Sequence, residues 1–339
     1  MIDPTICLQM YQDLIDLRYG HDKQRTLMIS KNHPLLDKSL EMDKNLKLGT
    51  GGSATVYACL GQDGKNLAVK CMSKKCNNLR FRSDLVIFHR KYCCFNTTSF
   101  LSSDTLLLPQ ELVIHRRLQE RASFQNYRIL RMIAWYENAG CWCLVLERAR
   151  TNLLQRTVLK IKNSGTPFCL KRAANYIRCI ALALEQCHQA GVMHLDLKLE
   201  NILLMGFQPA SVKLSDFGSA AMAPLADGFR GTMNSAAPEV MLWAFTPRQR
   251  KLYNLPTPEP YGKEADLWSL GVITFELLTG KLLYQDTIAD RVRVARGEVD
   301  LGKLDAIPVA KEFVCRLLRR RPSHRLSLEA CQDHAFLIQ

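Results

Sequence analysis

The chain has 339 residues, 47% of them hydrophobic and 23% charged, which is typical of a folded protein with a sizeable core and argues against a disordered chain. No apolar run approaches the roughly 18 to 20 residues of a membrane span, and the first residues do not resemble a signal peptide. The formal net charge of +14 can attract nucleic acid or acidic partners, but the basic residues are mostly dispersed and no aromatic-interleaved motif accompanies them, so nucleic acid is not the expected partner.

The thirteen cysteines are spaced like core residues rather than like metal ligands or bridges. Cys93 and Cys94 are adjacent, Cys141 and Cys143 alternate, and no C-x-x-C pair occurs. This spacing argues against a disulfide framework and against a zinc site. We therefore expect small core residues in a reducing, intracellular compartment, cytoplasmic and/or nuclear.

Residues 1–44 precede the first expected strand and are predicted to be an N-terminal extension. Residues 6–17 have the pattern of an amphipathic helix, and a polar linker follows them. Such an extension can dock on the folded part of the chain or bind a regulatory partner.

A glycine-rich run from Leu48 to Tyr57 lies between apolar stretches and is followed by a turn signal at 61–64. This pattern predicts a β-hairpin. Because Gly49 and Gly51 lack a Cβ atom, the backbone there can approach phosphate groups and donate N–H groups to them. Taken alone, such a hairpin is more often a tight turn than a nucleotide site, so its interpretation depends on the rest of the chain.

Two further elements follow the hairpin. The β-rich run 67–70 ends in a single lysine, Lys70, and residues 109–118 have the apolar spacing of a helix with Glu111 near its start. An acidic residue at that place also simply favours a helix N-terminus. The connection between the two elements is longer than a strand and a helix require, so residues 77–104 are predicted to be an insertion.

Residues 193–204 place Asp196, Lys198 and Asn201 in one polar run bracketed by apolar residues. A second carboxylate, Asp216, follows a strand-like run and precedes a Phe-Gly pair. Two acids and an amide on adjacent loops predict a metal and phosphate site. Asp196 can take a proton from a hydroxyl, and Lys198 can neutralise a phosphate in transfer. Asn201 and Asp216 can hold Mg²⁺.

These residues resemble the motifs of a eukaryotic-type protein kinase of the serine/threonine class. Residues 194–201 match the catalytic-loop motif at every polar position but one, and Asp-Phe-Gly follows at 216–218. Ala-Pro-Glu at 237–239 and the apolar run that opens at Asp266 come next in the family's order, so the resemblance covers residues 45–337. It implies an α+β, bilobal protein kinase fold: a small antiparallel β-sheet N-lobe with helix αC, and a larger, mainly helical C-lobe.

The resemblance also divides the chain. It implies an N-lobe at 45–147 and a C-lobe at 148–339. A second insertion, at 243–261, is expected beside the peptide-binding platform, and either insertion can serve a regulatory partner. Glu239 and Arg325 are expected to form a buried ion pair that holds this platform.

The catalytic residues that the resemblance implies are Asp196, Lys198, Lys70 and Glu111. Lys70 is expected to hold the α and β phosphates of ATP. Glu111 is expected to be the helix αC partner of this lysine, with Glu120 as the alternative.

The nucleotide site is assigned by the same resemblance, with ATP and Mg²⁺ as the expected ligands. Ala68 and Leu203 are expected to sandwich the adenine, and Glu147 to lie at the hinge beside Leu146 as the gatekeeper. Ala54 stands in place of the family's third glycine. The residues assigned to ATP binding are Leu48, Gly49, Thr50, Gly51, Gly52, Ser53, Ala54, Val56, Ala68, Lys70, Glu147 and Leu203.

Leu195 stands where most regulated kinases have an arginine that receives an activation-loop phosphate. The segment 220–231 contains no serine, threonine or tyrosine, so the usual acceptor is absent as well. Both departures predict a non-RD kinase that is active without activation-loop phosphorylation. Lys198 and Thr232 resemble serine/threonine kinases, which implies protein substrates modified at Ser or Thr hydroxyls. The Leu-Asp pair at 195–196 also resembles Mos-like kinases, but only locally.

Two other interpretations remain open. A pseudokinase scaffold would keep the fold to present its insertions to partners, but such scaffolds often lose the equivalents of Lys70, Asp196, Asn201 or Asp216, which are all present. A kinase for a small molecule fits less well, because the Ala-Pro-Glu platform resembles that of enzymes with protein substrates.

Overall fold

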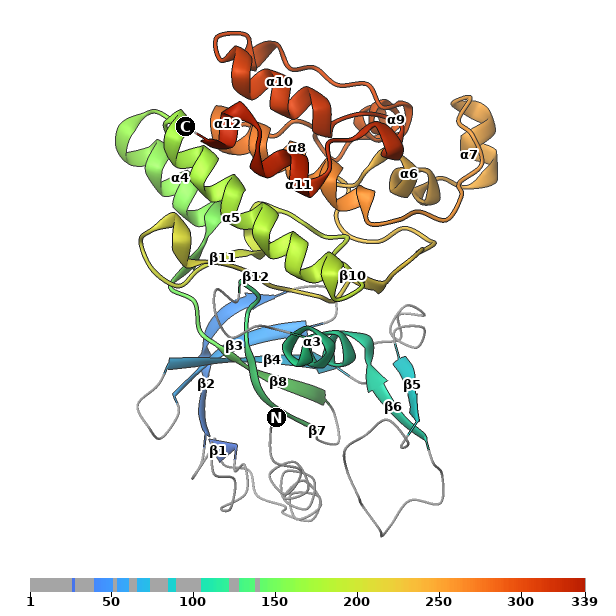
Figure 1. Cartoon of the computed structure of the whole chain (residues 1–339). Helices are drawn as coiled ribbons and strands as arrows, with labels where there is room; N and C mark the ends of the chain where they lie inside the picture. The colour runs from blue at the N-terminus through green and yellow to red at the C-terminus, as the bar shows by residue number, and fades with distance from the viewer. Residues whose placement is uncertain are drawn as a thin grey trace. The chain divides into compact units, whose positions relative to one another are not determined.

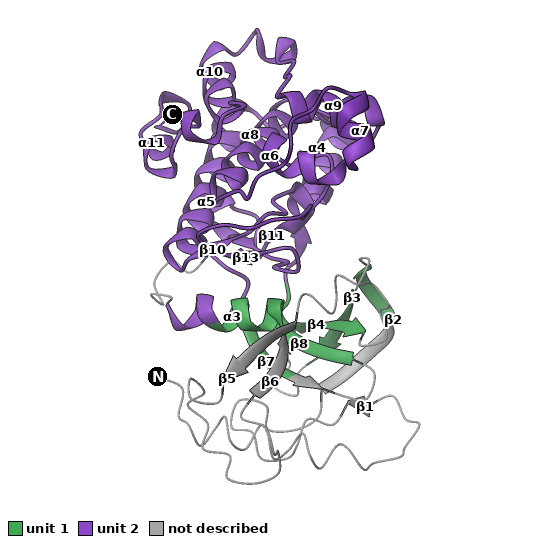
Figure 2. Cartoon of the chain, turned by 90° about the vertical axis from the view of Figure 1, so that its right-hand side faces the viewer, with its two compact units in different colours: residues 1–116, 131–148 green, residues 117–130, 149–339 purple. Residues whose placement is uncertain are grey.

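The computed structural model describes residues 26–27, 40–50, 54–60, 66–73, 85–89, 105–121, 128–137 and 141–338. The chain divides into two compact units, which are coloured separately in Figure 2. Unit 1 comprises residues 1–116 and 131–148, and unit 2 comprises residues 117–130 and 149–339.

Unit 1 is built on a six-stranded antiparallel sheet with the strand order β1-β2-β3-β4-β8-β7 (Figure 1). Its strands are β1 (Thr26–Leu27), β2 (Leu40–Thr50), β3 (Ala54–Leu60), β4 (Asn66–Ser73), β7 (Met132–Glu137) and β8 (Cys141–Glu147). A separate antiparallel pair consists of β5 (Leu85–His89) and β6 (Thr105–Pro109). β5 lies within the predicted insertion at 77–104, and the rest of that insertion lies outside the described residues.

Strand β4 is covered on both faces, which its sequence explains. Successive side chains of a strand point to opposite faces, and residues 67–70 are all buried. Leu67 and Val69 join a core cluster with residues of β3, β7 and β8. The helix of this region, α3 (Gln110–Glu120), buries Leu112 and Ile114 completely. The division assigns the residues of α3 up to Arg116 to unit 1.

Unit 2 is mainly helical and is organised around α5 (Leu170–Gln189) and α8 (Glu264–Thr279) (Figure 1). Helix α8 is buried along almost its whole length, as expected for a helix that is apolar all round. At Gly271 an added Cβ would meet the Leu318 side chain at 2.8 Å, so a glycine is needed where α8 packs closely on the end of α10. The other helices are α4 (Leu153–Ser164), α6 (Pro238–Met241), α7 (Pro247–Leu252), α9 (Ile288–Arg296), α10 (Pro308–Leu317), α11 (Leu328–Gln332) and α12 (Ala335–Ile338).

Short strands and 3-10 turns carry the loops of unit 2. The strands are β9 (Thr151–Asn152), β11 (Ile202–Leu204) and β12 (Val212–Leu214) in one antiparallel sheet, and β10 (Val192–Met193) with β13 (Ala221–Met222) in another. The 3-10 turns are η3 (Leu199–Asn201), η4 (Pro209–Ser211), η5 (Leu242–Ala244), η6 (Gly302–Leu304) and η7 (Pro322–His324).

The second predicted insertion, at 243–261, contains an ordered helix, α7. Pro247 occupies its first turn, where a missing N–H costs nothing. Thr246 and Gln249 form a capping box, in which each side chain bonds the other residue's backbone N–H. Local sequence signals therefore fix where this helix begins.

Within the described part of the chain, no helix combines the length and the apolar character required to cross a membrane.

Candidate active site

The loop that carries Asp196 is anchored on helix α8 by one buried carboxylate. Asp266 is fully buried and accepts the backbone N–H groups of His194 at 2.9 Å and Leu195 at 2.8 Å. Nε2 of His188 lies 2.8 Å from the same carboxylate. Burial raises the pKa of Asp266, but the hydrogen bond and charge of His188 and the hydrogen bond from the Leu195 N–H outweigh burial and lower it. The anchor is therefore an ionised carboxylate.

His194 joins this loop to the Asp216 loop. Its Nδ1 accepts the Asp196 N–H at 3.2 Å, so its Nε2 carries the proton and donates to the Ser215 carbonyl at 2.9 Å. The ring is completely buried and meets the Phe217 ring edge to face, with centroids 5.1 Å apart. One histidine thus fixes two neighbouring loops.

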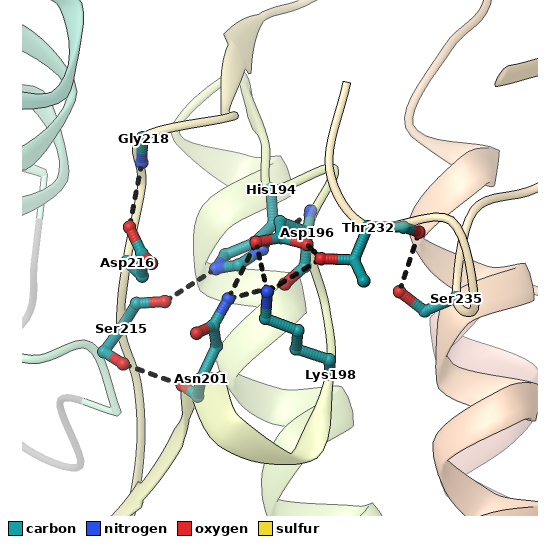
Figure 3. Close-up of polar contacts among 9 residues, drawn as sticks. All are labelled: His194, Asp196, Lys198, Asn201, Ser215, Asp216, Gly218, Thr232 and Ser235. Atoms are coloured by element: carbon teal, nitrogen blue, oxygen red, sulfur yellow. Dashed lines mark hydrogen bonds and ion pairs between the residues drawn. The ribbon is translucent and has the colours of Figure 1, made fainter. Parts of the chain in front are cut away.

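Asp196 lies at the centre of a polar cluster (Figure 3). Its Oδ1 accepts the Thr232 hydroxyl at 2.7 Å. Its Oδ2 lies 3.1 Å from Nζ of Lys198 and accepts from Nδ2 of Asn201 at 3.1 Å. Lys198 also donates to Oγ1 of Thr232 at 2.7 Å. The carboxylate is thus oriented by three different side chains.

Asn201 and Asp216 are brought to the same end of the β11–β12 pair, because Ile202 and Leu214 are register partners. Nδ2 of Asn201 donates to the Asp196 backbone carbonyl at 2.8 Å, and the Asn201 carbonyl accepts the Ser215 N–H at 3.0 Å. The Asn201 side chain therefore offers its amide oxygen and Asp216 its carboxylate. Oxygen ligands of these two kinds suit Mg²⁺, so the donor set fits the predicted ion.

The backbone near Asp196 adopts left-handed conformations. Leu195 has φ 60° and Asp216 has φ 62°, in a region that residues other than glycine seldom occupy. Gly231 has φ 83°, and a Cβ atom there would lie only 2.1 Å from the Leu195 carbonyl oxygen. Position 231, immediately before Thr232, therefore requires a glycine.

In unit 1, Lys70 on β4 and Glu111 on α3 form a buried ion pair. Nζ of Lys70 lies 2.7 Å from Oε1 and 2.8 Å from Oε2 of Glu111. Glu120, the alternative partner in the sequence, is exposed. The structure therefore pairs Lys70 with Glu111.

The glycine-rich hairpin is described in part. Gly49 pairs with Val56, and among the described residues no heavy atom lies within 4 Å of a Cβ placed on Gly49. Packing among these residues therefore does not require glycine here, and the space beside the backbone suits the approach of a ligand. Leu48 is 42% exposed, and Ala54 begins β3. Thr50 ends β2, while the predicted residues Gly51, Gly52 and Ser53 lie outside the described residues.

The predicted adenine and hinge residues are divided between the two units. Ala68 is buried on β4 opposite Leu146, and Leu203 lies on β11 of unit 2. Oε1 of Glu147 accepts the Arg131 N–H at 2.7 Å. This hydrogen bond within unit 1 was not predicted for Glu147, which was expected only to lie at the hinge.

Arg325 and Glu239 form a bidentate ion pair in unit 2. NH1 and NH2 of Arg325 lie 2.6 Å and 2.7 Å from the two carboxylate oxygens of Glu239. The Arg325 side chain has no exposed surface, and it also donates to three backbone carbonyls, those of Glu264, Arg319 and Arg320. This pair ties α6 to the turn that follows α10.

Three residues of this site were not assigned to it from the sequence. In the sequence, Thr232 indicated only the class of substrate, and Gly231 was only part of a segment without phosphate acceptors. Asp266 was only the start of an apolar helix. A Gly-Thr pair between the Asp-Phe-Gly and Ala-Pro-Glu motifs was the available signal for the first two. No local pattern points from Asp266 to the loop that it anchors.

Comparison with known proteins identifies the family. Residues 95–337 match the family model described as the protein kinase domain. This match covers more than half of the chain, so the chain belongs to the protein kinase family.

The similar proteins carry kinase names. The serine/threonine-protein kinase PEPKR2 of Arabidopsis thaliana is 27% identical over 237 residues, which are 67% of this chain and 46% of that protein. The testis-specific serine/threonine-protein kinase 5 of Mus musculus is 28% identical over 86% of this chain and 73% of its own length. The Aurora kinase of Schizosaccharomyces pombe is 29% identical over 71% of this chain and 65% of its own length. The chain thus spans about half to three quarters of these relatives.

A solved structure supports the fold. The crystal structure of Rad53 1-466 in complex with AMP-PNP superposes with a TM-score of 0.60 at 22% sequence identity, over 88% of this chain and 65% of that one. Together with the antiparallel sheet of unit 1 and the mainly helical unit 2, this likeness confirms the predicted α+β kinase fold.

Proposed function

We propose that this protein is an ATP-dependent serine/threonine protein kinase that transfers the γ-phosphoryl group to protein Ser or Thr hydroxyls. The cluster around Asp196 is the observation that carries the proposal. Oδ1 of Asp196 accepts a threonine hydroxyl of the chain itself at 2.7 Å, which is the chemical group of the proposed acceptor. The names of the relatives and of the AMP-PNP complex support the same reaction class.

The chain's own residues divide the work of this reaction. Asp196 orients the incoming hydroxyl and accepts its proton, while Lys198 stabilises charge that spreads over the transferred phosphoryl oxygens. Lys70, oriented by Glu111, binds the phosphates of ATP together with the glycine-rich hairpin. Asn201 and Asp216 are the residues that would hold Mg²⁺, whose charge would offset that of the phosphates.

The proposal includes activity without phosphorylation of the activation segment. Leu195 is 7% exposed and apolar, so it offers no charge to a phosphate. The segment 220–231 contains no hydroxyl side chain, and the hydroxyl of Thr232 already contacts Asp196 and Lys198. The bonds from Asp266 support the loop from within helix α8, a support that needs no phosphate.

Partners and location are also proposals. Protein substrates follow from the family, and a regulatory partner would bind residues 1–44 or one of the insertions. The proposed location is cytoplasmic and/or nuclear, on the basis of the cysteine spacing.

One experiment tests the reaction and its independence of phosphorylation together. Protein made in bacteria and treated with phosphatase is incubated with labelled ATP, Mg²⁺ and mixed basic and acidic protein substrates. We expect transfer by the unmodified protein and a loss of about 10²- to 10⁴-fold in Asp196→Asn, because the general base is removed. Nucleotide binding should survive the substitution. Asp286→Asn is the matched control, since Asp286 is exposed and pairs only with Arg291 among the contacts of the described residues.

Three results would count against the proposal. Near-normal transfer by Asp196→Asn would remove Asp196 from the reaction. A large gain after an upstream kinase phosphorylates Ser219 or Thr232 would contradict independence of the activation segment. If neither protein transfers phosphate although both still bind ATP, the scaffold interpretation is favoured.

A further inference from the structure

Two thiols face each other across the central strands of the unit 1 sheet. Cys71 of β4 and Cys143 of β8 are register partners, and their Sγ atoms are 3.4 Å apart. Residues directly opposite in antiparallel strands have Cα atoms about 4.5 or 5.5 Å apart, within the range of about 4.4 to 6.8 Å found in disulfides. We propose that Cys71 and Cys143 form a reversible cross-strand disulfide when the protein meets a peroxide.

The surroundings of the pair define the order of events. Cys143 is 1% exposed and belongs to the core cluster that also contains Cys59 and Val145, whereas Cys71 packs at the edge of that cluster and is partly exposed. A small oxidant therefore reaches the sulfur of Cys71 first. Cys143 is then the resolving thiol, because its sulfur lies in contact with that of Cys71.

The chemistry balances with hydrogen peroxide as the oxidant. The Cys71 thiolate attacks one peroxide oxygen, the O–O bond breaks, and a sulfenic acid and hydroxide form. The Cys143 sulfur then attacks the Cys71 sulfur, and the S–O bond breaks as the S–S bond forms. Two thiols and one peroxide give one disulfide and two waters, and the two electrons pass from sulfur to oxygen. An added dithiol reverses the reaction by thiol–disulfide exchange.

The disulfide should affect ATP binding because the cysteine pair lies beside Lys70, and this effect rests on the proposed function. Lys70 directly precedes Cys71 on β4 and is held by Glu111 at 2.7 Å. Bond formation draws the two sulfur atoms together by about 1.4 Å. Lys70 and Cys71 are consecutive residues of β4, so a backbone shift at Cys71 moves Lys70 relative to Glu111. Oxidised protein should therefore bind ATP more weakly than reduced protein.

The bond itself is tested by mass mapping of the full chain. The reduced protein is treated with hydrogen peroxide, alkylated, digested and analysed with and without dithiothreitol. We expect a linked pair of peptides that contain Cys71 and Cys143, lighter by two hydrogen atoms and separated by the reductant. Cys71→Ser and Cys143→Ala should each abolish the link. Because there are two variants, the test does not depend on the folding of either one alone.

Cys141→Ser is the matched control, because Cys141 lies on the same strand as Cys143 but opposite Ser73. This variant should keep the link. A link between Cys71 and another cysteine, or a Cys71 that proceeds to sulfinic acid without linking, would overturn the proposal.

The consequence is measured by calorimetric titration of ATP with Mg²⁺ into reduced and oxidised protein. We expect Kd to rise severalfold on oxidation of the unmodified protein and of Cys141→Ser, and to stay constant in peroxide-treated Cys71→Ser. A link that forms without any change in Kd would overturn the effect on Lys70. Failure of the reduced protein to bind ATP would instead overturn the proposed function, and the mass mapping would still decide the disulfide.

Discussion

Thr232 joins the segment between residues 218 and 237 to the polar cluster around Asp196. Its hydroxyl donates to Asp196 and accepts from Lys198, both at 2.7 Å, so one oxygen positions a carboxylate and an ammonium group together. Gly231 makes this possible, since a side chain at 231 would collide with the Leu195 carbonyl. Thr232 is thus a positioning residue for the two groups that the proposed reaction uses.

Removal of this hydroxyl should slow phosphoryl transfer without unfolding the protein. We expect Thr232→Ala to lower kcat by about 10- to 100-fold, because hydrogen bonds to two charged groups are lost, and to leave the KM for ATP nearly unchanged. Thr232→Ser retains the hydroxyl and should stay close to the unmodified protein. Steady-state kinetics of both variants measure the effect.

A threonine outside the site provides the control. Thr287 caps helix α9 through the Asp290 N–H at 3.1 Å, so Thr287→Ala should reduce stability slightly and leave kcat unaltered. Equal losses in Thr232→Ser and Thr232→Ala would show that shape rather than the hydroxyl matters.

Among the elements, α6 and the turn after α10 are held together by the Glu239–Arg325 pair. Arg325 is buried and bonded at every edge of its guanidinium group, while Glu239 is its anionic partner. Removal of one partner leaves a buried charge without compensation. This situation costs far more than the pair itself contributes.

We expect Arg325→Met to lower the free energy of unfolding by about 3 to 5 kcal/mol. Equilibrium urea denaturation gives this value. Arg291→Met breaks the exposed pair with Asp286, whose atoms are 2.6 Å apart, and should cost less than about 1 kcal/mol. The interpretation fails if the two substitutions are equally costly.

Some contacts of the candidate site could be predicted from the sequence. Asp196, Lys198 and Asn201 lie within six residues, so their meeting follows from one short loop. The pairing of Lys70 with Glu111 was expected from the family resemblance, and the structure contains that contact.

Other contacts depend on the path of the chain between distant segments. The bonds from Asp266 to residues 194 and 195 and the approach of Gly231 to Leu195 have no signature in either segment alone. Helix α7 was expected only as an insertion, although its capping residues could have located it. Periodicity identifies elements, but contacts between loops require the packing of the whole unit.

At the scale of the whole molecule, one acid makes stability depend on pH. Glu276 of α8 has a pKa raised from 4.5 to about 8, first by burial and second by the charge of Glu200. The folded state therefore keeps a proton that the unfolded state releases above pH 4.5. The unfolded state binds fewer protons between about pH 4.5 and 8, so the contribution of Glu276 to stability falls as pH rises through this window.

Glu276→Gln removes this titration. Relative to the unmodified protein, we expect the variant to gain on the order of a few kcal/mol in the free energy of unfolding between pH 5 and pH 8. Urea denaturation at several pH values measures the difference. Glu298→Gln, which removes an exposed carboxylate, is the control for the loss of one negative charge. Parallel pH profiles for the unmodified protein and Glu276→Gln would contradict the assignment.

The hydrogen bonds from Asp266 to the loop of Asp196 bear on when the protein becomes active. The pKa of Asp266 is lowered, so it stays charged at neutral pH, and its bonds to the loop backbone come from helix α8, which is buried in the core of unit 2. On the proposed function, the loop of Asp196 is in place as soon as the chain has folded, with no later step at the activation segment. The onset of activity then follows translation, and its decline follows the rate at which the chain is degraded.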